Sequence, residues 1–277
     1  MGLQMPSSEI RSENYRFLQE RVYAETGIVL DEHKHYLFEA RLAPVARQLG
    51  LQSIDDLCAL LQATRDAEVG RQVVEAMTTN ETYFFRDPAQ YEAIRTVLLP
   101  RLVEERRDTK KLWFWSAAAS SGQEAYSLAM LLLGCGLEDW RIHILGTDFS
   151  TQVLDRARSA VYQQIEVNRG LPAALLVKHF RRSGMDWQLD ARVRSMVRFE
   201  RIDLRKGLSA LGPFDLVFCR NVLIYFDAQT KQRILRDLHG TLFRGGWLML
   251  GGSETAFGLD SLFEQKTVGS AAVYIAR

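Results

Sequence analysis

The chain has 277 residues, 47% of them hydrophobic and 25% charged, a composition typical of a folded globular protein. Its 35 basic and 34 acidic side chains give a formal net charge of +1, which argues against a nucleic-acid partner. The spacing of Cys58, Cys135 and Cys219 suits neither a zinc site nor a disulfide framework, and no stretch has the apolar length of a membrane span or secretory signal. We therefore expect a cytoplasmic protein with no metal and no membrane insertion.

Residues 1–76 are predicted to form a small helical domain. Apolar residues recur at helical spacing in two segments: Tyr15, Leu18 and Val22 in the first, and Leu37, Ala40, Pro44 and Val45 in the second. Asp31 is expected to cap the second helix, which should run through Arg47 and stop at Gly50. Two shorter helices are predicted at 54–61 and 69–77.

Residues 77–90 (MTTNETYFFRDPAQ) connect this domain to the rest of the chain. Asp87, Pro88 and Gln90 have the spacing of a helix cap, a first-turn proline and a capping-box partner. The next helix should therefore begin here and run to about residue 105.

Residues 91–277 alternate short apolar strands with amphipathic helices. Strands are predicted at 112–116, 142–147, 214–219 and 247–250, helices at 121–133, 150–160 and 229–243, and a final hairpin at 268–275. This alternation predicts an α/β fold with a parallel sheet covered on both faces. Residues from about 162 to 200 interrupt it and are predicted to be an insertion that recognises a partner.

Polar residues follow two of the predicted strands. After the first, in WSAAASSGQEAYS, Glu124 could form a capping box with Ser121 or meet the ammonium group of a bound methionine moiety. After the second, in LGTDFS, Asp148 could accept hydrogen bonds from both hydroxyls of a ribose or help cap the next helix, for which Ser150 is better placed. The carboxyl ends of parallel strands share one edge of the sheet, so both acids should lie there.

A third polar pair, Arg220 and Asn221, directly follows the strand in FDLVFCRNVLIYFD. Tyr225 lies between apolar residues and could be a core residue or a catalytic one. Asp227 has the position of an ordinary helix cap.

Together these segments resemble the chemotaxis receptor glutamate methyltransferases, the CheR proteins. The matching segments are TTNETYFFRD, WSAAASSGQEAYSLAM, GTDFSTQVLDRAR, GPFDLVFCRNVLIYFD and GGSETAF, in the family's order and spacing. The resemblance spans essentially the whole chain. It implies a class I S-adenosylmethionine-dependent methyltransferase: a Rossmann-like doubly wound sheet with an all-helical N-terminal domain and an inserted antiparallel β-subdomain.

The resemblance also implies a set of cofactor contacts: Asn80, Thr82, Arg86, Glu124, Asp148, Asp203, Leu204, Arg220 and Asn221. Arg86 and Tyr225 would lie nearest the transferred methyl group. The family often has Asn where this chain has Asp203, and a carboxylate cannot donate a hydrogen bond to a ring nitrogen of adenine. The implied donor is S-adenosylmethionine and its product S-adenosylhomocysteine.

A glutamate acceptor fits these residues because it is already ionised at neutral pH and needs no general base. The five histidines, at 33, 35, 143, 179 and 239, all lie outside the cofactor motifs. The fold alone allows two other functions. One is a methyltransferase that acts on RNA or a small molecule, and the other is a non-catalytic protein that senses the cofactor and binds receptors.

The partner implied by the resemblance is the cytoplasmic helical region of chemotaxis receptors. Lys34, Arg41 and Arg47 could form a docking face on the second helix, or simply a solvated helix face. Some family members grip a C-terminal receptor peptide through the inserted subdomain. The stretch RRSGMDWQLD is short by comparison, so we expect this chain not to depend on that pentapeptide tether.

Overall fold

The computed structural model describes residues 10–30, 35–64 and 66–277. These residues form two compact units. One extends to Thr79 and also includes Tyr225–Asp227, and the other comprises Asn80–Ile224 and Ala228–Arg277.

The first unit contains four helices, α1 (Ser12–Thr26), α2 (His35–Gln48), α3 (Ile54–Thr64) and α4 (Ala67–Met77). Tyr15, Leu18 and Val22 are buried, as their spacing in α1 predicts. In α2 the prediction is partly confirmed: Val45 is buried and Leu37 packs against the core, but Ala40 and Pro44 are exposed. The other buried residues of α2 are Phe38, Leu42 and Ala46. Pro44 lies inside this helix, and the expected cap, Asp31, lies outside the described residues.

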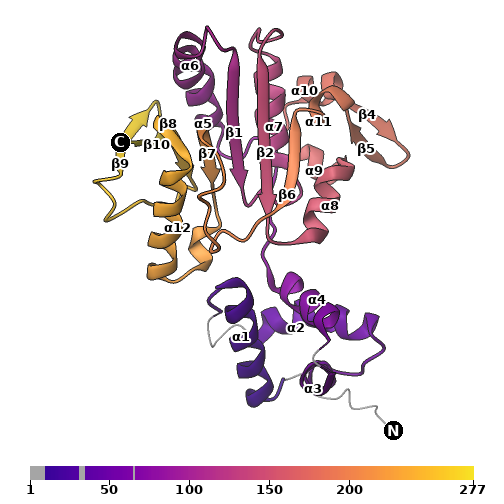
Figure 1. The fold of residues 1–277 in the computed structure, drawn as a ribbon. Helices are drawn as coiled ribbons and strands as arrows, with labels where there is room; N and C mark the ends of the chain where they lie inside the picture. The colour runs from indigo at the N-terminus through magenta and orange to yellow at the C-terminus, as the bar shows by residue number, and fades with distance from the viewer. Residues whose placement is uncertain (1–9, 31–34, 65) are drawn as a thin grey trace. The chain divides into compact units, whose positions relative to one another are not determined.

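A seven-stranded sheet forms the centre of the second unit (Figure 1). Its strands are β1 (Lys111–Ala117), β2 (Arg141–Asp148), β6 (Val197–Arg201), β7 (Phe214–Cys219), β8 (Leu242–Leu250), β9 (Phe263–Val268) and β10 (Ala271–Ala276). Their order is β6-β2-β1-β7-β8-β10-β9. The pairs from β6 to β8 are parallel, and β10 is antiparallel to both of its neighbours, β8 and β9. The chain order reverses next to β1, which is where doubly wound sheets bind ligands.

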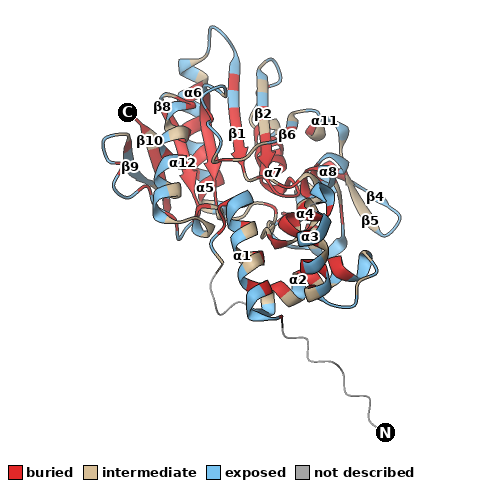
Figure 2. Ribbon diagram, turned by 60° about the horizontal axis from the view of Figure 1, so that its bottom comes forward, coloured by how far each residue is buried: buried red, intermediate tan, exposed pale blue. Residues whose placement is uncertain are grey.

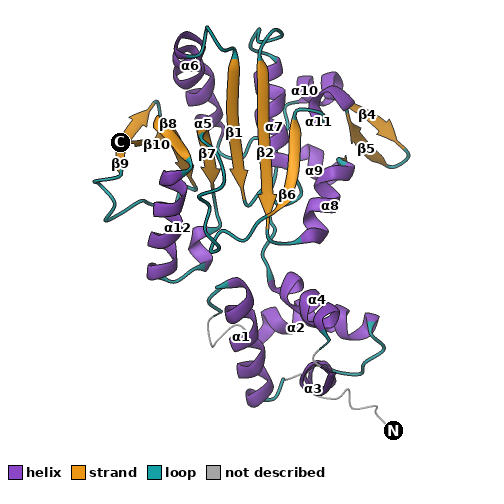
Figure 3. Cartoon of the chain, in the orientation of Figure 1, coloured by secondary structure: helices purple, strands orange, loops and turns teal. Residues whose placement is uncertain are grey.

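Helices cover the central strands, which are buried on both faces (Figures 2 and 3). The helices of this layer are α5 (Pro88–Ala93), a π-helical turn (Ile94–Leu98), α6 (Leu99–Glu105), α7 (Gln123–Leu133), α8 (Thr151–Ser159) and α12 (Ala228–Gly240). Phe114, Leu216 and Phe218 belong to one hydrophobic cluster with residues of α5 to α8. Because burial of apolar surface supplies most of the driving force, continuous apolar runs such as FDLVFC form these central strands.

Several predicted boundaries differ from the structure. The strand β8 begins at Leu242 instead of residue 247. The helix α12 ends at Gly240 instead of residue 243, because Leu242 pairs with Phe214 and begins β8. The helix α7 begins at Gln123 instead of residue 121, with Gly122 as its N-cap.

The predicted insertion contains a three-stranded antiparallel sheet in the order β3-β5-β4. Its elements are β3 (Val161–Tyr162), α9 (Gln164–Asn168), α10 (Ala173–His179), β4 (Phe180–Ser183), β5 (Asp186–Leu189) and α11 (Ala191–Arg194). The next strand, β6, pairs with β2 in the main sheet, so the last residues of the predicted stretch belong to the main sheet. No helix in the described part of the chain is both long and apolar enough to span a bilayer.

Candidate functional site

The loops after the parallel strands converge at the carboxyl edge of the large sheet. The loop after β1 is tied to β2 by a hydrogen bond from the Ala119 amide to the Thr147 carbonyl, 2.7 Å. The segment after β6 is tied to β2 by a bond from the Ile202 amide to the Asp148 carbonyl, 3.0 Å. The predicted site residues of several separate motifs therefore lie along one edge.

The loop between β1 and α7 has an unusual backbone. Ala118, Ser120 and Gly122 all have positive φ, at 70°, 50° and 93°. A Cβ at position 122 would lie 3.0 Å from the Cβ of Ala157 in α8 and 3.1 Å from the Phe199 ring. Gly122 therefore serves the close packing of the start of α7.

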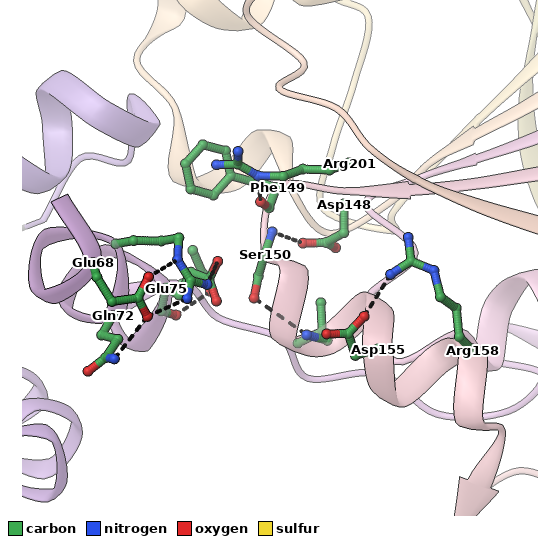
Figure 4. Close-up of polar contacts among 12 residues, drawn as sticks. Glu68, Gln72, Glu75, Asp148, Phe149, Ser150, Asp155, Arg158 and Arg201 are labelled. Carbon is green, nitrogen blue, oxygen red and sulfur yellow. Dashed lines mark hydrogen bonds and ion pairs between the residues drawn. The ribbon is translucent and has the colours of Figure 1, made fainter. Parts of the chain in front are cut away.

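Asp148, the last residue of β2, is fixed by backbone donors. Its carboxylate accepts hydrogen bonds from the amide of Ser120 at 2.9 Å and from the amide of Ser150 at 3.0 Å (Figure 4). The residue is buried. Ser150 caps α8, its hydroxyl accepting from the amide of Val153 as the sequence predicts. Because these contacts join the loops after β1 and β2, the carboxylate is oriented before any ligand binds.

Arg220 and Glu124 form a buried ion pair at the same edge, which the half-exposed Asp87 joins. The Arg220 guanidinium donates to Glu124 at 3.0 Å and to Asp87, and also to the carbonyl of Arg86 at 2.7 Å. The second oxygen of Glu124 accepts from the Ser116 hydroxyl at 2.6 Å. These contacts join β1, α7, the loop after β7 and the connecting segment.

Two predicted capping interactions are wrong because this cluster takes the side chains. Glu124 forms no capping box, and Ser121 donates instead to Gln123. Asp87 lies at the N-cap of α5 and Pro88 follows it, but the Asp87 side chain makes no cap hydrogen bond and pairs with Arg220. A charged hydrogen bond to a buried guanidinium is stronger than a cap exposed to solvent.

Burial raises the pKa of Glu124, while the adjacent Arg220 opposes that rise. Burial lowers the pKa of Arg220, but Glu124 and Asp87 outweigh it and hold that pKa above its ordinary value. The charge of Arg86, from the connecting segment, also opposes the rise in the pKa of Glu124. Two guanidinium groups therefore face the two carboxylates, Glu124 and Asp87.

The connecting segment carries three of the predicted site residues, Asn80, Thr82 and Arg86, and the Arg86 carbonyl accepts from Arg220. The Asn80 carbonyl accepts from the Ser120 hydroxyl at 2.7 Å, which ties the segment to the loop after β1. The partly exposed Arg86 side chain lies 5.4 Å from the centre of the Tyr83 ring and 3.4 Å from the Glu81 carbonyl.

Asp203 and Leu204 follow β6. The Asp203 carboxylate binds Arg205, two residues further along the chain. It accepts from the Arg205 side chain at 3.0 and 2.7 Å and from the Arg205 amide at 3.0 Å. Leu204 is buried. Arg205 therefore brings hydrogen-bond donors to a position where the sequence indicated only acceptors.

The turn after β7 holds Asn221 in the left-handed region, with φ of 57°. Its side-chain oxygen is buried and accepts no hydrogen bond from the described residues. Glu254 is not among the predicted site residues. Its buried carboxylate accepts a hydrogen bond from the Asn221 amide at 2.7 Å. The only sequence signal was its place in GGSETAF, directly after β8.

The remaining predicted site residues belong to the helical unit. Tyr225 packs against its hydrophobic core, and the Tyr225 carbonyl accepts from the Val29 amide at 2.8 Å. Arg41 donates to the carbonyls of Met77 and Thr78, at 2.7 and 3.1 Å, and to the Thr79 hydroxyl. Arg47 is exposed, and Lys34 lies outside the described residues.

A cavity of about 450 Å³ lies elsewhere in the second unit, and Trp113, His143 and Leu211 are among its lining residues. It contains none of the predicted site residues. The described part of the chain contains no group of three or more His, Cys, Asp and Glu side chains that could hold a metal.

Both units of the chain match a known protein family in sequence. The CheR methyltransferase all-alpha domain matches residues 13–78, and the CheR methyltransferase SAM binding domain matches residues 80–271. Chemotaxis protein methyltransferase Cher2 of Pseudomonas putida is 37% identical over 95% of this chain and 98% of its own length. Chemotaxis protein methyltransferase 1 of Pseudomonas aeruginosa is 38% identical, over 93% and 96%.

Chemotaxis protein methyltransferase of Vibrio parahaemolyticus is 35% identical over 98% of this chain and 99% of its own length. The two matched domains confirm the fold expected from the sequence, a helical domain joined to a class I methyltransferase sheet. This chain belongs to the CheR methyltransferase family.

Proposed function

We propose that the chain transfers a methyl group from S-adenosylmethionine to glutamate side chains of chemotaxis receptors, forming methyl esters in sensory adaptation. The observation that carries this proposal is that the buried Glu124–Arg220 pair and the oriented Asp148 carboxylate both lie at the carboxyl edge of the sheet. These residues lie in a region that matches the SAM binding domain of the family.

The residues present fit this cofactor. Glu124, a buried carboxylate at the carboxyl edge of the sheet, is the proposed partner of the ammonium group of the cofactor. Asp148 has an oriented carboxylate for ribose hydroxyls, and the Asn221 side-chain oxygen is a buried acceptor without a donor among the described residues. S-adenosylmethionine supplies an electrophilic methyl group on a sulfonium when bound.

The chain's own contribution is to position two ligands and exclude water. A glutamate acceptor is already ionised at neutral pH, so no side chain has to remove a proton. Arg86 could orient that carboxylate by a two-pronged contact. The Tyr225 hydroxyl could donate a single hydrogen bond to it. Asn80, Thr82 and Leu204 complete the proposed pocket. Positioning for in-line attack is the main requirement of the reaction.

The proposed partner is the helical cytoplasmic region of a chemotaxis receptor, which places the protein in the cytoplasm. Arg47 is exposed and available for docking. Arg41 already binds the C-terminal carbonyls of α4, so we assign docking to Arg47 with Lys34 and give Arg41 a supporting role.

We expect receptor recognition not to depend on a C-terminal peptide tether. The hairpin of β4 and β5 is short, with only Gly184 and Met185 between its strands. Titration of a receptor-tail pentapeptide should give no binding at low micromolar concentration, and receptor fragments with and without the tail should be methylated at equal rates. Low micromolar binding of the peptide would contradict this expectation.

Methyl-labelled cofactor and a panel of receptor cytoplasmic fragments test the proposed function. We expect labelled receptor whose label is released as methanol in mild base, because carboxyl methyl esters hydrolyse under these conditions. Base-stable label would favour a methylated amine or ring nitrogen instead. Cofactor binding without turnover on any fragment would favour a non-catalytic sensor.

We expect Asp148→Ala to weaken binding of S-adenosylhomocysteine by about 1 to 3 kcal/mol, the range for lost hydrogen bonds to a charged group. Isothermal titration calorimetry would measure the dissociation constant. Asp155→Ala is the matched control, because Asp155 is an exposed acid of α8 that pairs with Arg158 (Figure 4). An unchanged dissociation constant for Asp148→Ala would remove Asp148 from the pocket.

A further inference from the structure

Glu254 is a buried carboxylate whose partners are all main-chain amides. It is 8% exposed and follows β8 in the segment GGSETAF. One carboxylate oxygen accepts from the amides of Asn221 at 2.7 Å and Gly251 at 2.8 Å. The other accepts from the amides of Val222 at 3.0 Å and Ile224 at 3.2 Å.

These four donors fill the acceptor capacity of the carboxylate, which has about four lone-pair sites. No cationic side chain of the described residues forms an ion pair with Glu254. The oriented amides therefore stabilise its charge. Because three donors come from the turn after β7 and one from the turn after β8, Glu254 fastens the two neighbouring turns together.

The turn that Glu254 holds is the one that carries Arg220 and Asn221. Asn221 has a φ of 57°, a conformation that a non-glycine residue keeps only when its surroundings fix it. Its amide is the closest donor to Glu254. Glu254 thus compensates the strained backbone at Asn221.

Gly251 allows these groups to lie so close together. A Cβ at position 251 would lie 2.7 Å from the side-chain nitrogen of Asn221 and 2.7 Å from a carboxylate oxygen of Glu254. Any side chain at this position would displace one of them. The Asn221 side-chain oxygen, held in this arrangement, has no donor among the described residues and can accept one from a ligand.

We infer that Glu254 is a positioning residue of the cofactor pocket, which holds the turn after β7 so that the Asn221 side chain is presented to the cofactor. This inference rests on the proposed function, because it requires that Asn221 contact S-adenosylmethionine. Glu254 itself needs no contact with either ligand. Its contribution to binding passes through the backbone of the turn.

The test compares Glu254→Gln with Asp215→Asn by titration of S-adenosylhomocysteine. The glutamine side chain places an NH2 group against backbone N–H donors, so the turn should lose its fixed geometry. Asp215 is the matched control: it is 1% exposed and accepts from the Trp113 amide at 2.9 Å and from Arg106, but it lies at the start of β7. Thermal unfolding of both variants measures the general loss of stability.

We expect Glu254→Gln to weaken S-adenosylhomocysteine binding about tenfold to a hundredfold, and Asp215→Asn to leave it within about twofold, although both lose stability. A double-mutant cycle with Asn221→Gly, which tolerates the positive φ, adds a readout that a merely structural role would not move. In the Asn221→Gly background, Glu254→Gln should change affinity less than about twofold. Equal effects in both backgrounds would overturn the inference.

Glu254→Asp covers the case in which Glu254→Gln does not fold. It keeps the charge but is one methylene shorter, so it should fold and still bind S-adenosylhomocysteine more weakly than the wild type. Wild-type affinity in either folded variant, or failure of both to fold, would overturn the inference and leave the proposed function standing. Failure of the wild-type chain to bind S-adenosylhomocysteine would overturn both.

Discussion

Arg86→Ala is expected to reduce methyl transfer to a receptor fragment by about a hundredfold or more, the size of effect produced by misplacing reacting groups. Its free energy of unfolding should fall by no more than about 1 kcal/mol. Among the described residues, the partly exposed Arg86 side chain contacts the Tyr83 ring and the Glu81 carbonyl, and its charge has a minor influence on the pKa of Glu124. Initial rates with labelled cofactor, together with denaturant unfolding, would measure both quantities.

Arg169→Ala is the matched control for this prediction. The exposed Arg169 guanidinium lies 4.4 Å from the centre of the same Tyr83 ring and pairs with Glu81 at 2.6 Å. It therefore shares the surroundings of Arg86 but belongs to no predicted site. Near-normal turnover in Arg86→Ala, or an equal loss in Arg169→Ala, would remove Arg86 from the reaction.

Arg220→Met is expected to destabilise the fold by about 3 to 5 kcal/mol, because removing one partner of a buried ion pair leaves an uncompensated buried charge. The Arg220 side chain is 1% exposed and that of Glu124 is 12% exposed, so water cannot replace the lost contact. Methionine keeps most of the side-chain volume. Equilibrium unfolding in urea would measure the loss.

The loss in Arg220→Met should depend on pH. Burial already raises the pKa of Glu124, and Arg220 is the main opposing influence, so this pKa should rise further in the variant. A carboxyl group with a raised pKa binds more protons in the folded than in the unfolded state, so its stability falls as pH rises through the folded pKa. The deficit relative to the wild type should therefore be smallest near about pH 5 and largest near about pH 8.

The double variant Arg220→Met with Glu124→Gln is the control for this explanation. If the unpaired charge of Glu124 causes the loss, adding Glu124→Gln should recover part of the stability and flatten the pH dependence. A loss that is independent of pH and unchanged by Glu124→Gln would point to packing as the cause.

Much of the methyltransferase unit was readable from the sequence, for a local reason. The strand Phe214–Cys219 has the predicted bounds, because an apolar run between turn residues can be buried in only a few ways. The sequence predicted that Asp148 and Arg220 lie at one edge, because Asp148 ends one such strand, Arg220 directly follows another, and parallel strands share that edge.

The partners of the polar side chains could not be read in this way. Glu124 and Asp87 have the spacing of helix caps, yet both bind Arg220, which is far away in sequence. In α2, the spacing of Leu37, Ala40 and Pro44 with Val45 suggested one face, while packing exposed Ala40 and Pro44 and buried Phe38 and Leu42. Local patterns do not contain the competition between a cap and a buried cation, or between two faces of a short helix.

The sequence by itself determined the order of strands and helices, the edge of the sheet that carries the polar residues, and the family to which the chain belongs. Only the tertiary structure decided which carboxylate pairs with Arg220, that Asp203 binds Arg205, and that Glu254 fastens two turns through four amides. The physical reason is that periodicity and turn chemistry act over a few residues, whereas the hydrogen-bond partners of a buried charge are whatever the folded chain brings within about 3 Å.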